Sequence, residues 1–193
     1  GVAVGDPEFT ADKQVGTFAG NFDGVGDYAL ISHSSDFLVG SSAFSVSSWV
    51  KLPSGSPLAT NDDNYAVLFK GTWGNPLLQL SIRGGSYRGL FLRGYGGSYV
   101  DTKPTVDQSS IFLDYGWHHI AGVKDDANNC YVYLDGKLVG TRTSCNYSLD
   151  NTRDLFIGRD GSNYTDIKID ESAFWSTNLS HEEVDSTTCG YIT

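Results

Sequence analysis

Residues 44–51 read Phe44-Ser-Val-Ser-Ser-Trp-Val-Lys51, and their side chains alternate with a period of two. That period is the one at which successive side chains of a β-strand point to opposite faces of a sheet. One face would carry Phe44, Val46, Ser48 and Val50, and the other Ser45, Ser47, Trp49 and Lys51. The stretch therefore predicts a strand with an apolar side facing a core.

Similar runs occur along the rest of the chain, separated by Gly, Asn and Asp turns at intervals of about ten residues. They lie at 65–70, 78–83 with Leu78, Leu80 and Ile82 inward, 90–95 with Leu90 and Leu92 inward, 117–123, 131–134, 137–139, 155–158 and 167–175. No helical pattern alternates with them, which excludes a parallel α/β sheet. The chain is therefore predicted to be all-β, with its strands in a sandwich or a barrel.

Two local signals refine this prediction. Asp135-Gly136 between two apolar runs predicts a tight hairpin with a glycine at positive φ. Ser180-His-Glu-Glu183 is a capping box and predicts one short C-terminal helical turn, which we expect to cover an end of the sandwich. The stretches 53–63 and 100–114 are expected to be loops, where binding residues tend to lie.

Length and charge limit the possible functions. The 193 residues fit a single domain over 1–193, and a net charge of −10 argues against nucleic acid and anionic membranes. No apolar stretch is long enough to span a bilayer, so membrane insertion is not expected. Residues 1–7 lack the features of a signal peptide, and we expect the domain to be cut from a larger extracellular protein.

The chain contains three cysteines, Cys130, Cys145 and Cys189, so at least one is unpaired within it. Cys130 and Cys145 flank the predicted hairpin and are the expected disulfide. The alternative is that all three are buried thiols that act as small apolar side chains.

Six pieces of sequence occur together in one order: Asn21-Phe-Asp-Gly-Val-Gly-Asp-Tyr28, Phe44-Ser-Val-Ser-Ser-Trp-Val-Lys51, Gly116-Trp-His-His-Ile-Ala-Gly-Val123, Tyr133-Leu-Asp-Gly-Lys-Leu-Val-Gly140, Leu155-Phe-Ile-Gly-Arg-Asp160 and Ile169-Asp-Glu-Ser-Ala-Phe-Trp175. In these pieces the chain resembles the laminin-G-like, pentraxin-like branch of the concanavalin A-like lectin/glucanase superfamily. The resemblance implies two antiparallel sheets packed as a jelly-roll β-sandwich. It does not select a function, because members include glycan-binding modules, adhesion domains, recognition proteins and glycoside hydrolases.

Hydrolases of this superfamily carry two Glu with an Asp between them on one strand face, and this pattern is missing. The nearest match is Asp166, Lys168 and Asp170, with lysine in the middle. His118 and His119 are adjacent on a strand and point to opposite faces, so they cannot share a metal ion. We therefore expect no catalytic residues.

The resemblance to pentraxins implies calcium ligands in two rim turns, where this chain carries Trp73 and Asn75, and Asp160 and Asn163. Carboxylate and amide oxygens suit Ca²⁺. A second possible set is Asp23, Asp27 and Asp170, where the first and last family pieces would pair as antiparallel strands. Alternatively, these aspartates cap turns and accept hydrogen bonds from backbone amides.

A strip of Arg and Tyr side chains follows the middle strands and their turns. It comprises Arg83, Tyr87, Arg88, Arg93 and Tyr95, with Gln79, Ser81 and Tyr99 beside them; the rim residues Trp73, Asn75, Arg159, Asp160, Asn163 and Tyr164 complete the candidate binding set. Aromatic rings stack on sugar C–H surfaces, and guanidinium groups bind hydroxyls or carboxylates. The alternative is an ordinary solvated sheet face.

The sequence thus predicts a non-catalytic, lectin-like carbohydrate-binding module, extracellular or at the cell surface, that serves adhesion or substrate targeting. Its expected partner is a glycan or another cell-surface ligand, and Ca²⁺ is the one cofactor suggested. Two alternatives stay open: a protein- or peptide-recognition or spacer domain of an adhesin or fibre, and, more remotely, a glycoside hydrolase.

Overall fold

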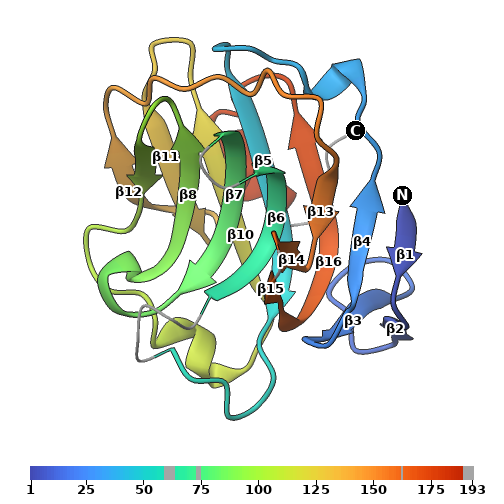
Figure 1. Cartoon of the computed structure of the whole chain (residues 1–193). Coiled ribbons are helices and arrows are strands. Elements are labelled where there is room, and N and C mark those ends of the chain that lie inside the picture. The colour runs from blue at the N-terminus through green and yellow to red at the C-terminus, as the bar shows by residue number, and fades with distance from the viewer. Residues whose placement is uncertain (59–63, 73–74, 162, 189–193) are drawn as a thin grey trace.

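The alternating runs form two antiparallel sheets that pack face to face, and Figure 1 shows one in front of the other. The computed structural model describes residues 1–58, 64–72, 75–161 and 163–188, and only the backbone of 75–77. The front sheet is ordered β1 (Val2–Val4), β4 (Tyr28–Ile31), β13 (Leu155–Ile157), β6 (Asn64–Thr72), β7 (Asn75–Arg83), β8 (Gly89–Tyr95) and β9 (Tyr99–Thr102). The back sheet is ordered β12 (Lys137–Arg142), β11 (Cys130–Leu134), β10 (His118–Lys124), β5 (Phe44–Lys51), β16 (Asp166–Trp175), β3 (Ala19–Asp23) and β2 (Glu8–Thr10). This arrangement confirms the predicted antiparallel jelly-roll sandwich.

The inner faces of the two sheets share one apolar core. It contains the inward residues predicted from alternation, namely Phe44, Val46, Val50, Leu78, Leu80, Ile82, Leu90 and Leu92, all almost fully buried. Ser48 also faces inward and is buried, and its hydroxyl is hydrogen-bonded to the Ser172 hydroxyl and the Asp170 carbonyl oxygen. Most of the polar side chains that could meet a ligand are therefore left to the outer faces and the rims.

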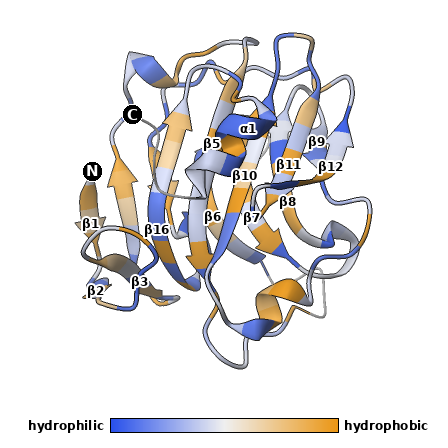
Figure 2. Cartoon of the chain, turned by 180° about the vertical axis from the view of Figure 1, so that it is seen from behind, coloured by the Kyte–Doolittle hydropathy of each residue, from blue (hydrophilic) through white to orange (hydrophobic). Residues whose placement is uncertain are grey.

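The short helix lies over the outer face of the back sheet, as Figure 2 shows, and not over an end of the sandwich as expected. It is α1 (His181–Thr187), and the predicted capping box between Ser180 and Glu183 is present. Val184 of α1 is fully buried and packs with Ala121, Val123, Tyr133 and Leu179. This face of β10 and β11 is apolar, and the helix covers it. Among the described residues, no helix is long and apolar enough to cross a membrane.

The predicted hairpin is present between β11 and β12, with Asp135 and Gly136 both at positive φ. The expected loop over 100–114 is only partly irregular. It contains most of strand β9 and the 3₁₀ turn η3 (Ile111–Asp114), while η1 (Ser35–Phe37) and η2 (Gly85–Tyr87) lie in other connections. β9 forms because it pairs with β8, and alternation within so short a strand is a weak signal.

The expected disulfide is not present in the structure, where Cys130 and Cys145 are free and buried thiols. The two thiols do lie close enough to influence each other. Cys130 Sγ also contacts the Tyr147 hydroxyl at 3.6 Å, and Cys145 Sγ contacts the Thr102 hydroxyl at 3.8 Å. In the structure, Cys130 and Cys145 are therefore buried thiols of the core, which was the alternative prediction. Cys189 lies outside the described residues.

The adjacent histidines of β10 face opposite sides, as predicted, and have opposite pKa shifts. His118 Nδ1 lies 2.9 Å from Asp135 Oδ2, and its Nε2 lies 3.0 Å from Asp114 Oδ1. Burial opposes protonation of His118, but the two carboxylates outweigh it and raise its pKa. Burial lowers the pKa of His119 to about 4. Protonated His118 thus joins η3 to the β11–β12 hairpin.

These shifts predict how stability depends on pH. The pKa of His118 is higher in the folded than in the unfolded chain. Its contribution to the free energy of unfolding is therefore fully present below the pKa of the unfolded chain, and it is lost as pH rises through the pKa of the folded chain. The difference in unfolding free energy between the wild type and His118→Gln should shrink as pH rises above about 6.5, the ordinary pKa of histidine. Urea unfolding at several pH values measures it, and a difference that stays constant would contradict this account.

Candidate functional site

Five side chains form one row across the outer face of the front sheet. The strand register places Phe156 of β13, Phe69 of β6, Gln79 of β7, Arg93 of β8 and Asp101 of β9 next to one another in that order. Alternation puts all of them on the side away from the core. The row passes from apolar residues at β13 and β6 to an ion pair at β8 and β9.

Arg93 is a buried structural residue of this face. Its Nε and Nη2 donate to the two Asp101 carboxylate oxygens at 2.6 and 2.9 Å, and Nη2 also donates to the Tyr87 hydroxyl at 2.8 Å. The guanidinium lies 4.7 Å from the centre of the Tyr99 ring. With these partners and 5% exposure, Arg93 orders the surrounding rings and offers little to a ligand.

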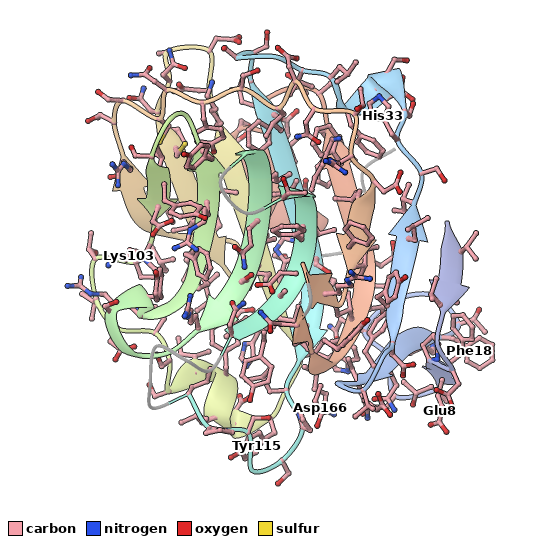
Figure 3. All side chains as sticks on the ribbon, viewed as in Figure 1. Glu8, Phe18, His33, Lys103, Tyr115 and Asp166 are labelled. Carbon is pink, nitrogen blue, oxygen red and sulfur yellow. The ribbon has the colours of Figure 1, made fainter. Side chains whose placement is uncertain are left out.

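The predicted strip beside Arg93 is an aromatic and basic group. Arg83 lies 4.7 Å and Lys103 5.5 Å from the centre of the Tyr87 ring, and Tyr95 meets Tyr99 edge to face at 5.2 Å. Figure 3 labels Lys103 at this side of the front sheet. The strip is therefore present, with one exception. Arg88 donates to the carbonyl oxygens of Pro104 and Thr105 and holds a loop.

A carboxylate with no exposed surface, Asp160, lies at the centre of the face. It accepts hydrogen bonds from the side-chain amides of Asn64, Gln79 (3.0 Å) and Asn163 (2.9 Å). The Oδ1 atom of Asn64 and the Oε1 atom of Gln79 are buried and have no hydrogen-bond partner among the described residues. A buried charge and two unsatisfied oxygens are costly unless a further group binds them.

Next to Asp160, the Arg159 guanidinium is enclosed by three aromatic rings. Its centre lies 4.6 Å from the ring of Tyr28, 4.9 Å from Phe156 and 5.4 Å from Tyr164. The short hairpin of β14 (Arg159–Asp160) and β15 (Asn163–Tyr164) supplies Arg159 and Tyr164. The Arg159 Nε also donates to the Gly161 carbonyl oxygen at 2.6 Å, which fixes the side chain inside this cluster.

A cavity of about 290 Å³ opens beside Arg159. It is lined by Phe69, Gly71, Thr72, Arg153, Asp154, Phe156, Arg159 and Gly161. Lys70 is fully buried and donates to the carbonyl oxygens of Asn151 (2.8 Å) and Arg153 (2.7 Å), so it anchors the loop that carries Arg153 and Asp154. The cavity thus combines aromatic walls, two guanidinium groups and one carboxylate on an anchored frame.

The second predicted calcium set does not come together. β3 and β16 pair as expected, but Asp23 lies opposite Asp166, and Asp170 is four residues further along, roughly 13 Å away. Asp170 accepts from the backbone amides of Gln14 (3.0 Å) and Val15 (2.9 Å), and Asp27 accepts from the amide of Asp6 (2.9 Å). The alternative role, in which these carboxylates bind backbone amides, is the one observed. In the described part of the chain, no three His, Cys, Asp or Glu residues are grouped to hold a metal.

Of the other predicted site residues, Trp73 and the side chain of Asn75 lie outside what the structure describes. The sequence reasoning missed Asn64, Lys70, Asp101 and Phe156, and it missed Tyr28, which reaches the site from the start of the chain. Lysine within the apolar run 65–70 was a usable signal for Lys70, whereas nothing in the sequence connects Tyr28 to Arg159.

The chain is similar to several solved structures. It aligns with the binding domain of Paraclostridial Mosquitocidal Protein 1 at a TM-score of 0.73 and 15% identity, covering 96% of this chain and 46% of that one. The receptor binding domain of botulinum neurotoxin C/D mosaic serotype gives 0.74 and 17%, covering 98% and 46%. Domain 4 of AbnA, a GH43 extracellular arabinanase from Geobacillus stearothermophilus, in complex with arabinotriose, gives 0.69 and 20%, covering 95% and 82%.

At these identities the similarities show the fold, and the chain spans less than half of the two toxin domains. No curated protein sequence matches the chain. A family model described as the concanavalin A-like lectin/glucanases superfamily matches residues 23–185, which is most of the chain. The chain therefore belongs to the concanavalin A-like lectin/glucanase superfamily.

Proposed function

We propose that this domain is a non-catalytic, extracellular carbohydrate-binding module that serves adhesion or targeting, and that its glycan binds on the outer face of the front sheet. The observation that carries the proposal is the cavity of about 290 Å³ between β6, β13 and the Arg159 turn. Its volume is near the lower end of the range for small-molecule sites and suits one or two sugar rings of a longer chain.

The chemistry of the cavity matches a saccharide. Phe69 and Phe156 offer apolar surface for the C–H face of a sugar ring, while Arg153 and Arg159 can donate to its oxygens. Asp154 can accept from hydroxyl groups, although one of its oxygens already accepts from the His33 amide at 2.9 Å. Tyr164 is 37% exposed and extends the aromatic surface away from the cavity.

The carboxylates of this face do not suit glycoside hydrolysis. That reaction needs two carboxyl groups on either side of the bond that breaks. The described lining of the cavity holds one, Asp154, while Asp160 is bound by three amides and Asp101 by Arg93. On the back sheet, the Asp170 carboxylate already accepts hydrogen bonds from backbone amides. Binding without catalysis fits these constraints.

The structural neighbours support the same function. A domain of this fold, part of an extracellular arabinanase, is described in complex with arabinotriose, and other neighbours are toxin binding domains, one of them in a study of two ganglioside molecules. The arabinanase is described as extracellular and the neurotoxin by its entry into cells, which supports an extracellular role here.

Screening the chain against neutral and acidic glycans, with arabinotriose included, tests the function. Arg153→Ala and Arg159→Ala should each weaken the best glycan by about tenfold or more, because each removes a charged hydrogen-bond donor worth about 1.5–3 kcal/mol. Lys137→Ala, on the exposed edge of the back sheet, is the control and should leave the affinity unchanged.

Failure of every glycan to bind would overturn the proposal. If a protein ligand still binds after glycosidase treatment, and if its binding depends on Arg153 and Arg159, this face recognises peptides instead.

We further propose that Ca²⁺ binds at Asp160. In support, the side-chain oxygens of Asn64 and Gln79, which no described residue satisfies, belong to amides that flank this carboxylate. Turning the amides would present these oxygens to a cation. Among the described residues, no Lys or Arg forms an ion pair with Asp160. With one carboxylate, the site suits the weak affinity of extracellular modules, about 10⁻⁴ to 10⁻³ M.

Adding about 10 mM CaCl₂ should raise the melting temperature of the wild type, because the ion binds only the folded state, whereas Mg²⁺ should not. Asp160→Asn should abolish the shift, and Asp23→Asn, from the other predicted set, should retain it. A site at Asp160 would be contradicted if Ca²⁺ left the melting temperature of the wild type unchanged, or if Asp23→Asn lost the shift while Asp160→Asn kept it.

A further inference from the structure

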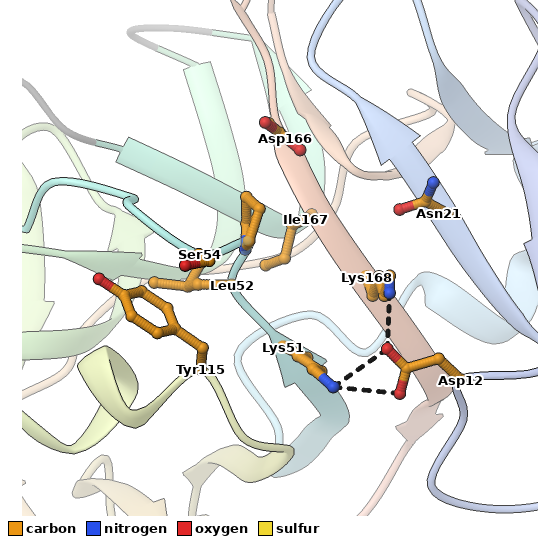
Figure 4. A pocket seen from close by; sticks show the side chains of 10 residues that line it. Asp12, Asn21, Lys51, Leu52, Ser54, Tyr115, Asp166, Ile167 and Lys168 are labelled. Atoms are coloured by element: carbon orange, nitrogen blue, oxygen red, sulfur yellow. Dashed lines mark hydrogen bonds and ion pairs between the residues drawn. The ribbon is translucent and has the colours of Figure 1, made fainter.

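A second pocket, of about 330 Å³, lies at the end of the back sheet where β5 stops and β16 continues (Figure 4). It is lined by Asp12, Asn21, Lys51, Leu52, Pro53, Ser54, Tyr115, Asp166, Ile167 and Lys168. Figure 3 shows Tyr115 and Asp166 at the same end of the molecule. None of these residues belongs to the front-sheet site.

Two like-charged pairs stand side by side in the sheet at this pocket. Lys51 of β5 lies directly opposite Lys168 of β16, and Asp23 of β3 lies directly opposite Asp166. Lys168 and Asp166 are two residues apart and share the outer face. Burial and the charge of Asp23 raise the pKa of Asp166. Directly opposed like charges destabilise a sheet unless another group compensates them.

Asp12 compensates the lysines only in part. Its carboxylate accepts from Lys51 Nζ at 3.0 and 3.1 Å, from Lys168 Nζ at 2.6 Å and from the Trp117 indole at 3.1 Å. The hydrogen bonds from Lys168 and then Lys51 lower the pKa of Asp12 to about 2. Within the described part of the chain, Asp12 is the one anion paired with these lysines. The cluster of Lys51, Lys168 and Asp12 therefore carries one net positive charge.

The lysines remain accessible to a ligand. The side chains of Lys51 and Lys168 are 26% and 29% exposed. An ammonium group has three N–H donors, and Lys168 gives one of them to Asp12. A ligand carboxylate could therefore bind at this cluster beside Asp12.

The rest of the lining selects the remainder of the ligand. Pro53 and the Tyr115 ring provide the accessible apolar surface above the buried Leu52 and Ile167. Asn21, Ser54 and Asp166 provide hydroxyl-binding groups. An apolar strip edged by such groups matches a sugar ring. The carboxylate of Asp166 would repel a highly charged anion such as a phosphate ester, so a singly charged ligand fits better.

We propose that this pocket binds a sugar that carries one carboxylate, of the uronic-acid class, with the carboxylate at Lys51 and Lys168 and the hydroxyls toward Asn21 and Asp166. It rests on the proposed carbohydrate-binding function for the class of ligand, but it uses different residues on the opposite sheet. A chain with both sites could hold two segments of an acidic polysaccharide, or two different chains.

Isothermal titration calorimetry of the whole chain, with a galacturonic acid trisaccharide and a neutral galactose trisaccharide, tests the proposal. The acidic sugar should bind at least about tenfold more tightly, and Lys168→Gln should remove this preference. Asp12→Asn should strengthen acidic-sugar binding, because it removes the competing carboxylate and leaves both ammonium groups. Lys137→Gln removes the same charge from the far edge of the sheet and should change nothing.

Arg159→Ala separates this proposal from the front-sheet site, because it should leave the acidic preference intact even if it abolishes glycan binding there. Equal binding of the two sugars, no binding of either, or an acidic preference unchanged in Lys168→Gln and Asp12→Asn would overturn the proposal. The melting temperature of each variant verifies folding, and Asp12→Asn keeps both lysines should Lys168→Gln fold poorly.

Discussion

The rest of the structure depends on the apolar contact between the inner faces of two sheets. With side chains alternating at a period of two, every strand that gives one side chain to this core must give its neighbour to an outer face. Leu78, Leu80 and Ile82 go inward, so Gln79 and Ser81 go outward. The outer face of the front sheet, where we propose that the glycan binds, is therefore a direct consequence of the packing that holds the sheets together.

The two outer faces differ in what covers them. Over β10 and β11 the back sheet is apolar, and α1 buries Val184 against it. The front sheet instead carries a buried carboxylate, an ion pair and several rings, with amide oxygens that the described residues leave unsatisfied. Groups of this kind are costly in a purely structural surface and useful at a binding site. This contrast is the main reason to place the glycan on the front sheet.

Sequence patterns predicted the strands and their faces well because alternation is a local property. The 135–136 hairpin and the Ser180 capping box are local too, and both are present. The helix position was wrong, because which surface α1 covers depends on apolar residues of β10 and β11, distant in the sequence. The Arg93–Asp101 ion pair was missed for a similar reason, since Asp101 lies in a short strand identified by its pairing with β8. Tyr28 and Arg159 meet only through the order of strands in the sheet.

The central claim is that a glycan occupies the front-sheet cavity without being cleaved. Backbone amide NMR of the isotope-labelled chain, titrated with the strongest glycan found by screening, tests it most directly. The account predicts that shifts concentrate in β6, β13 and residues 153–164, and that the glycan remains intact in the sample. Shifts confined to the helix-covered back face, or appearance of cleaved sugar, would contradict it.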